Sequence, residues 1–374
     1  MSKNKHKVLF VTGLFSPFQI DMAYEINKVN LFEYYVAFTL PYALRRGKHW
    51  QVKVKKEYDK YIIVPNNIIS PKMQAVWASR IIMKVRPQIV ISGFYKGPIF
   101  KEIAKTTKNI NSILAFWGEP PNLLYSKLLI KIYQKLILNK NLKNAKFIFG
   151  IGERAVNIYK ENFPGDVYLV PYAQDLSTHF NINRKTKTKS EKITFLFSGQ
   201  LVRRHNIRLI AKALMKLYKL YPNKFVFVIA GYGPEEYIFW DIIRREPEIE
   251  KQIIWDREYE TWEDRVKPFY YSDVLIYPSK HAGWGLVVPE AMASGIVVIT
   301  TSKVGAARYY IKDGVNGIFI EPAFEQLYIK LEWCINNKDN IFKMGKQARI
   351  DVKKKGTAIT VSKQFCNIVR RYLT

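Results

Sequence analysis

The chain has 374 residues, with 60 Lys and Arg against 31 Asp and Glu, and its formal net charge is +29. Hydrophobic residues make up 48% of it and aromatic residues 14%, a composition that excludes a disordered polycation and predicts folded domains. Because single hydrophobic cores stop growing beyond about 250 residues, the length predicts two domains. The positive charge is compatible with nucleic acid, an anionic membrane face or phosphorylated small molecules as partners.

Cysteine usage and the N-terminus bear on where the protein works. Only Cys334 and Cys366 occur, which excludes a disulfide framework and a cysteine-rich metal site. The basic residues 1–7 precede an apolar run too short for a signal peptide, and no apolar run approaches the roughly 20 residues of a membrane span. These features predict a cytoplasmic protein.

Short apolar runs alternate with segments of helical length along the whole chain. In the first half they occupy residues 8–12, 61–64, 89–92, 113–117, 147–150 and 167–170, and in the second half 193–198, 225–230, 253–255, 274–277, 296–300 and 317–320. Strands that are apolar throughout are typical of a parallel sheet covered on both faces. The pattern predicts two doubly wound α/β domains.

A polar stretch divides the two series of strands. We place an N-terminal domain at 1–180, a linker at 181–192 and a C-terminal domain at 193–356. Residues 357–374 read as a final helix, which we expect to pack back on the N-terminal domain.

Two loops of the second half carry the chemistry. The strand 193–198 runs into Gly199, and the cations Arg203 and Arg204 precede a helix for which Asn206 is a candidate N-cap. A glycine turn and cations ahead of a helix N-terminus favour an anion such as phosphate. Taken on its own, this segment is more often a solvated loop with surface arginines.

The second loop follows the strand 274–277. It has a Gly-x-Gly turn at Gly283 and Gly285, and then a helix that we expect from about Leu286 to Gly295. Glu290 lies one turn into this helix, where a carboxylate can accept two hydrogen bonds from a ribose diol. Two helix N-termini from neighbouring βα units are thus predicted to face one diphosphate.

Five ordered blocks resemble a known family, the retaining nucleotide-sugar-dependent glycosyltransferases of the GT-B fold, family 4 type (glycosyl transferases group 1). The blocks are residues 198–201, 230–235, 283–295, 304–306 and 313–317. The resemblance implies two Rossmann-like, doubly wound domains facing a central cleft, the first for the acceptor and the second for the donor. It also implies a hexosyltransferase that moves a hexose-type sugar from a nucleoside-diphosphate sugar to a glycan or lipid-linked acceptor with retention, as in cell envelope polysaccharide biosynthesis.

Residue roles follow from the same resemblance. Glu290 matches the second glutamate of the family's E-x7-E motif, which holds the ribose, whereas the first glutamate falls on Ala282. The family's arginine and lysine fall on Gln200 and His205, so Arg203 and Arg204 are candidates to supply the missing charge. The full set of candidate donor-binding residues is Gly13, Gln200, Arg203, Arg204, His205, Gly233, Gly283, Trp284, Gly285, Leu286, Val287 and Glu290.

The candidates for catalysis are fewer. Glu119, at the end of a first-domain strand, is the best carboxylate for the cleft, although a loop or capping acid is an equal alternative. His281, beside the Gly-x-Gly turn, is the candidate general acid or base, although a lone histidine in a loop is more often structural or solvated. The chain has no Asp-x-Asp, so we expect no essential metal, and Gly150 and Gly152 sit too late in their domain for a dinucleotide site. No cofactor is predicted.

Residues 125–146 combine lysines four apart with aliphatic residues, the pattern of a basic amphipathic helix on an anionic bilayer. A core helix with a solvated lysine edge is the alternative. Lipid-linked acceptors in the family favour peripheral contact with the inner face of the membrane.

The chain shows no nucleic-acid motif, so no specific nucleic-acid partner is predicted, and a glycosyltransferase acting on nucleic acid ranks last. The principal rival to the enzyme is a GT-B scaffold weakened catalytically by Ala282, which would act as a polyanion- or membrane-binding partner protein.

Overall fold

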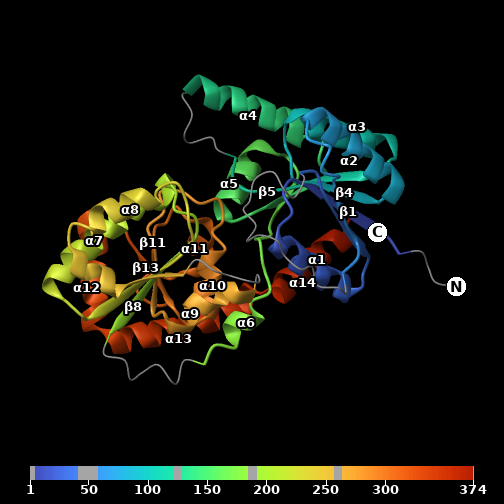
Figure 1. Ribbon diagram of the computed structural model, residues 1–374. Coiled ribbons are helices and arrows are strands. Elements are labelled where there is room, and N and C mark those ends of the chain that lie inside the picture. The colour runs from blue at the N-terminus through green and yellow to red at the C-terminus, as the bar shows by residue number, and fades with distance from the viewer. Residues whose placement is uncertain (1–4, 41–57, 122–127, 184–191, 257–262, 374) are drawn as a thin grey trace. The chain divides into compact units, whose positions relative to one another are not determined.

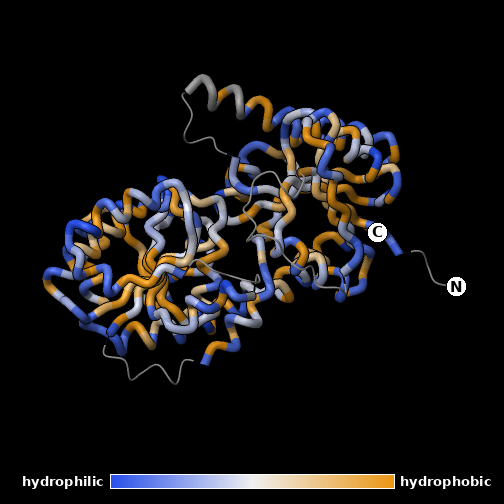
Figure 2. Tube along the Cα trace, viewed as in Figure 1, coloured by the Kyte–Doolittle hydropathy of each residue, from blue (hydrophilic) through white to orange (hydrophobic). Residues whose placement is uncertain are grey.

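The structure is a computed structural model that describes residues 5–40, 58–121, 128–183, 192–256 and 263–373 (Figure 1). The chain divides into two compact units, one of Met1–Asp175 with Ala358–Thr374 and the other of Leu176–Thr357. Each unit is built on one parallel sheet with helices around it, and the predicted pair of doubly wound α/β domains is confirmed. Figure 2 shows the strands as predominantly hydrophobic segments at the centre of each unit.

The first sheet has seven strands in the order β3-β2-β1-β4-β5-β6-β7, and every pair within it is parallel. Its strands are β1 (Lys7–Thr12), β2 (Glu33–Phe38), β3 (Tyr61–Ile63), β4 (Ile89–Ser92), β5 (Ile113–Gly118), β6 (Phe147–Gly150) and β7 (Asp166–Leu169). The sequence did not predict β2. This strand begins with a charged residue, Glu33, which makes its apolar run less conspicuous than the others. The Glu33 carboxylate lies 3.0 Å from Lys60 Nζ.

Helices cover both faces of this sheet. They are α1 (Pro17–Val29), α2 (Pro71–Val85), α3 (Gly97–Asn109), α4 (Leu128–Leu142), α5 (Glu153–Asn162) and α14 (Ala358–Arg370). Leu114 of β5 packs in a core cluster with α2 and α3, and Phe116 packs in a cluster with α4 and α5. Residues two apart on a strand point to the same side, so these four helices share one face.

The opposite face is closed by α1 and the last helix of the chain, α14. Phe365 of α14 is fully buried, and its ring lies 5.4 Å from that of Trp117 and 5.1 Å from that of Phe149. Ser362 Oγ donates to the carbonyl of Met22 in α1 at 3.2 Å. The C-terminal helix therefore belongs to the hydrophobic core of the first unit.

The second sheet has six strands in the order β10-β9-β8-β11-β12-β13, again all parallel. They are β8 (Ile193–Ser198), β9 (Phe225–Ala230), β10 (Ile253–Asp256), β11 (Val274–Tyr277), β12 (Val297–Thr300) and β13 (Ile318–Phe319). The helices of this unit are α6 (Ser177–Phe180), α7 (Ile207–Leu220), α8 (Glu236–Ile243), α9 (Lys267–Tyr271), α10 (Val287–Ala293), α11 (Gly305–Tyr310), α12 (Phe324–Asn336) and α13 (Lys338–Lys355).

The boundary between the units lies at Asp175, five residues before the end that the sequence suggested for the first domain. The reason is α6, which packs in the second unit: Arg349 of α13 donates to the carbonyls of Phe180 and Ile182. Of the linker predicted at 181–192, residues 184–191 lie outside the described residues. Among the described helices, none has the length and apolar character that a membrane span requires.

The burial of Phe365 predicts a large loss of stability on truncation. Phe365→Ala should lower the local free energy of unfolding of the first unit by about 3–5 kcal/mol, because a buried aromatic ring leaves a cavity. Amide hydrogen exchange of β1 and β4 measures this without requiring the two units to unfold together. Ile359→Ala is the matched control, since this α14 side chain is 52% exposed; an equal loss in both variants would contradict the packing role of Phe365.

Candidate active site

The order of the second sheet marks one edge as a binding site. From β8 the chain continues to β9 on one side, and it returns to β11 on the other side. Doubly wound sheets bind ligands beyond the carboxyl ends of the strands at the point where the strand order reverses. The loops after β8 and β11 begin at this point, and they are the two loops that the sequence singled out.

Glycines bring the loops at this edge into backbone contact. Gly199 after β8 and Gly231 after β9 have φ angles of +144° and +146°, and a Cβ atom on Gly231 would overlap the carbonyl oxygen of Gly199. A Cβ atom on Gly305, which begins α11, would likewise overlap the carbonyl oxygen of Gly283. The edge is therefore lined largely by main-chain groups, whose amides are suited to binding an anion.

Tyr277, the last residue of β11, forms the floor between the two glycine turns. A Cβ atom on Gly199 would lie 3.9 Å from one edge of its ring, and a Cβ atom on Gly285 would lie 4.0 Å from the other edge. The residue is 6% exposed, and burial raises the pKa of its hydroxyl well above the usual value. Tyr277 is thus a neutral spacer that fixes the separation of the two turns.

Hydrogen bonds join the loop after β8 to the loop after β11. Lys280 N donates to the carbonyl of Arg204 at 2.7 Å, and Asn206 Nδ2 donates to the carbonyl of Pro278 at 2.9 Å. Asn206 is the N-cap residue of α7, as predicted, but its side chain makes no cap hydrogen bond. The side chain instead cross-links the two loops.

A short chain of hydrogen bonds connects Arg204, His205 and Ser279. The His205 ring is 3% exposed; Nε2 accepts from Arg204 Nε at 3.2 Å, and Nδ1 lies 3.1 Å from Ser279 Oγ. Burial, and then the charge of Arg204, lower the pKa of His205 to about 4. The ring is therefore neutral near pH 7, and its proton lies on Nδ1, which donates to Ser279.

These contacts change the expected role of His205. From the family resemblance, His205 occupies the position of a lysine and is a candidate donor-binding residue. Its buried ring is neutral, however, so it brings no charge to a phosphate. We infer that it is a positioning residue behind Arg204. Arg203 and Arg204 are exposed in the short turn Arg203–His205, and Gln200 is exposed before it.

The Gly-x-Gly loop leads into α10. Glu290, in the first turn of this helix, is 6% exposed. Trp284 is also buried, and its indole ring packs 5.8 Å from Tyr309 and 5.9 Å from Tyr310. The remaining predicted residues of this loop are half-buried, namely His281, Gly283, Gly285, Leu286 and Val287.

Two predicted residues, Gly13 and Glu119, belong to the first unit. Gly13 follows β1 and Glu119 follows β5, both at the carboxyl edge of the first sheet. Glu119 is exposed, and its main-chain carbonyl accepts from the hydroxyl of Tyr159. Both residues stay predictions as members of the site. The described residues contain no cluster of three His, Cys, Asp or Glu side chains able to hold a metal ion.

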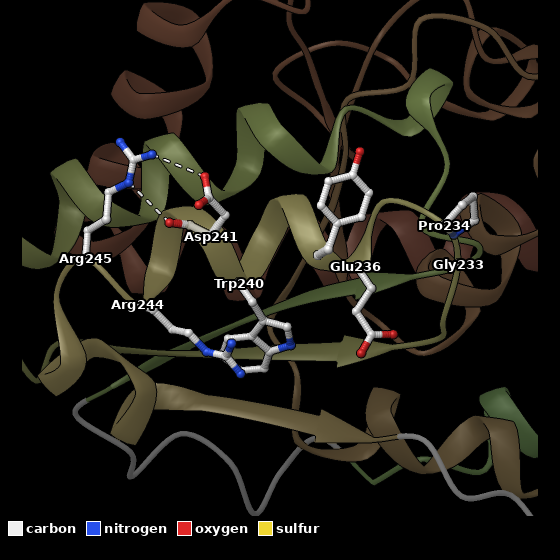
Figure 3. Close-up of a pocket in the computed structure, with 8 residues that line it drawn as sticks. Gly233, Pro234, Glu236, Trp240, Asp241, Arg244 and Arg245 are labelled. Atoms are coloured by element: carbon white, nitrogen blue, oxygen red, sulfur yellow. Dashed lines mark hydrogen bonds and ion pairs between the residues drawn. The ribbon is translucent and has the colours of Figure 1, made fainter.

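A pocket of about 900 Å³ opens beside Gly233, along α8 (Figure 3). Two arginines of the pocket contact other residues that line it: Arg245 lies 3.2 Å from Asp241, and Arg244 lies 5.5 Å from the ring of Trp240. Trp240 stacks on Trp255 of β10 at 5.3 Å. The pocket is lined by Gly233, Pro234 and side chains of α8.

Sequence reasoning did not select Tyr277 or Ser279. Both belong to the stretch Tyr277-Pro278-Ser279, which follows a buried strand directly, and that position at a carboxyl end was the available signal. Their roles depend on contacts with Gly199 and His205, which lie more than 70 residues away in the chain.

Comparison with known proteins agrees with this geometry. Residues 179–351, nearly the whole second unit, match the family model "Glycosyl transferases group 1". The similarity to this family therefore rests on the second unit. An uncharacterised glycosyltransferase of Methanocaldococcus jannaschii, MJ1607, is 30% identical over 143 residues, which are 38% of this chain and 35% of that protein. The chain matches 35% and 49% of the length of two such relatives.

Solved structures extend the similarity in fold to both units. A glycosyltransferase from Rickettsia africae superposes with a TM-score of 0.73 at 18% identity and covers 100% of both chains. Anabaena HepE, solved in complex with UDP and glucose, superposes with a TM-score of 0.69 at 13% identity over 98% of this chain and 99% of that one. The protein has the GT-B fold.

The buried histidine predicts an acid-sensitive fold. Because the pKa of His205 is about 4 in the folded chain against 6.5 when unfolded, the unfolded chain binds the extra proton between these values. The contribution of His205 to the free energy of unfolding should be fully present above about pH 6.5 and should fall by up to about 3 kcal/mol toward pH 4.

His205→Asn should flatten this pH dependence, measured as the free energy of unfolding in urea at several pH values. His6→Asn, at an exposed histidine, is the control and should retain the dependence of the unaltered chain. The interpretation is wrong if both variants keep the same slope.

Proposed function

We propose that the protein is a glycosyltransferase that moves a sugar from a nucleoside-diphosphate sugar to a glycan or lipid-linked acceptor. The observation that carries this is the cross-linked pair of loops after β8 and β11, where main-chain groups, Arg204 and Glu290 lie at the reversal of the second sheet. The structure of HepE with UDP and glucose supports a nucleotide sugar as donor. A hexose donor and retention at the anomeric carbon rest on the family resemblance.

In this proposal the donor diphosphate lies over Tyr277, between the turn at Gly199 and the turn at Gly285. Glu290 accepts hydrogen bonds from the ribose hydroxyls, which offsets the burial of its carboxylate. The pocket along α8 leaves room for the nucleobase beside Gly233. The acceptor lies against the first unit, where Gly13 and Glu119 end their strands.

The chemistry needs few acid or base groups from the protein. Departure of the nucleoside diphosphate develops negative charge, which the loop amides and the Arg203–Arg204 pair stabilise. The leaving phosphate oxygen takes the proton of the acceptor hydroxyl, so the absence of a glutamate at Ala282 removes a sugar contact and leaves the proton transfer intact. Since the chain lacks Asp-x-Asp, these cations replace a metal ion bridging the diphosphate.

Nucleotide binding tests the proposal directly. UDP, GDP and ADP are screened by thermal shift, in which a ligand at about 100 times its Kd adds roughly 2.7 kcal/mol of stability. Glu290→Ala should weaken the preferred nucleotide about tenfold or more, because a buried charge-assisted hydrogen-bond pair is lost. Glu321→Ala, at an exposed glutamate of the same unit, should leave affinity unchanged. Stabilisation by none of the three nucleotides would refute the enzyme and favour the scaffold protein.

The cation pair gives a separate test. Arg203→Ala/Arg204→Ala should raise the Kd of the nucleoside diphosphate about tenfold and reduce its dependence on salt, since two charges beside a diphosphate are removed. Isothermal titration at two salt concentrations measures both effects. Arg208→Ala, at an exposed arginine that is the second residue of α7, is the control. Unchanged affinity in the double variant would remove the arginines from the donor site.

A further inference from the structure

An apolar stripe runs along the outer side of α2. Met73, Val76 and Met83 are 46%, 50% and 46% exposed, and Ile69 just before the helix is 61% exposed. The spacing of three, four and seven residues places Met73, Val76 and Met83 on one side of the helix together with Arg80. Large apolar side chains gathered on a surface in this way are typical of an interaction site.

Cations surround this stripe. Lys72, Arg80 and Lys84 are exposed on α2, and Lys101, Lys105 and Lys108 are exposed along one side of α3, which packs against α2. The only acidic residue on the two helices is Glu102, which is half-buried. Within the described part of the chain, none of these six cations takes part in an ion pair.

The same combination recurs on α4. Ile132 and Leu136 are 49% and 63% exposed, and Lys135, Lys140 and Lys143 are exposed around them, whereas Leu138 and Leu142 are buried in the core. Residues 125–127 of the amphipathic segment predicted from sequence lie outside the described residues. The helix places aliphatic side chains both in the core and in solvent.

The three helices form one surface because they share a face of the first sheet. Leu114 and Phe116, two residues apart on β5, contact the α2–α3 cluster and the α4–α5 cluster respectively. The outer sides of α2, α3 and α4 therefore point away from the same sheet face, and Figure 1 shows these helices along one side of the unit. We call this surface the outer layer.

We propose that the outer layer docks the protein on an anionic lipid bilayer. Lysines and arginines meet lipid phosphates, while the stripe of α2 and the pair Ile132 and Leu136 enter the boundary of the acyl chains. Two helices that combine exposed apolar residues with cations favour a bilayer over nucleic acid, which would use the cations alone. The inference does not depend on the nucleotide site, since it concerns a separate unit of the chain.

Vesicle flotation with the full chain tests this inference. The protein should float with vesicles that contain about 30 mol % phosphatidylglycerol in phosphatidylcholine at low salt, and not with pure phosphatidylcholine. Lys101→Glu/Lys105→Glu/Lys108→Glu should weaken binding at least about tenfold, because three cations near the surface become anions. Met73→Ser/Val76→Ser/Met83→Ser should weaken it several-fold and increase its sensitivity to salt.

The matched control reverses three exposed charges on α13 of the second unit, as Lys343→Glu/Lys346→Glu/Lys353→Glu, and should bind within about twofold of the unaltered chain. Thermal unfolding and nucleotide affinity of every variant report whether the fold and the donor site persist. An equal loss of vesicle binding in the α3 and α13 variants would show that binding depends only on net charge, and this would overturn the proposal. Vesicle binding unaffected by the α2 substitutions would identify a polyanion surface instead, and failure of the unaltered chain to float would exclude bilayer docking.

Discussion

Close contact between backbones at one edge of the second sheet is the constraint on which the candidate site depends. Gly231 lies against the carbonyl of Gly199, and Gly305 lies against that of Gly283, and neither position has room for a Cβ atom. The loops after β8 and β9 therefore meet closely, as do the loops after β11 and β12, and the turns at Gly199 and Gly285 flank the ring of Tyr277. The result is a surface with many main-chain groups, which suits an anion.

The charge at this edge is arranged differently from what the resemblance to the family suggests. A lysine would bring a flexible ammonium group to the phosphates, whereas here a neutral buried imidazole accepts a hydrogen bond from Arg204 Nε. A guanidinium fixed at Nε keeps its remaining donors directed outward in a planar fork. His205 and Ser279 thus supply orientation, and the charge comes from the neighbouring arginine.

The cations behind the large net charge lie in different structural settings. Arg203 and Arg204 belong to the candidate site of the second unit, whereas the outer layer of the first unit gathers cations around exposed aliphatic residues. Cations set among apolar side chains differ chemically from a uniformly polar basic surface, since they favour a partner with both phosphate and hydrocarbon. Composition alone could not separate these contexts, because it counts charges without placing them.

The sequence by itself determined the architecture and the two loops of the site. Apolar runs alternating with helical segments predicted parallel sheets, and most strands lie within a residue or two of their expected positions, because buried parallel strands need continuous apolar residues. The apolar pattern did not predict strand β2, because this strand begins with the charged residue Glu33.

Only the tertiary structure decided which groups act together. The burial that makes His205 neutral, the cross-link from Asn206 to Pro278 and the position of Tyr277 between two turns all join residues distant in sequence. The return of α14 to the first unit and the shared face of α2, α3 and α4 likewise follow from how strands are ordered in a sheet. Periodicity reports which side of an element is buried, but the neighbours that bury it are set by long-range packing.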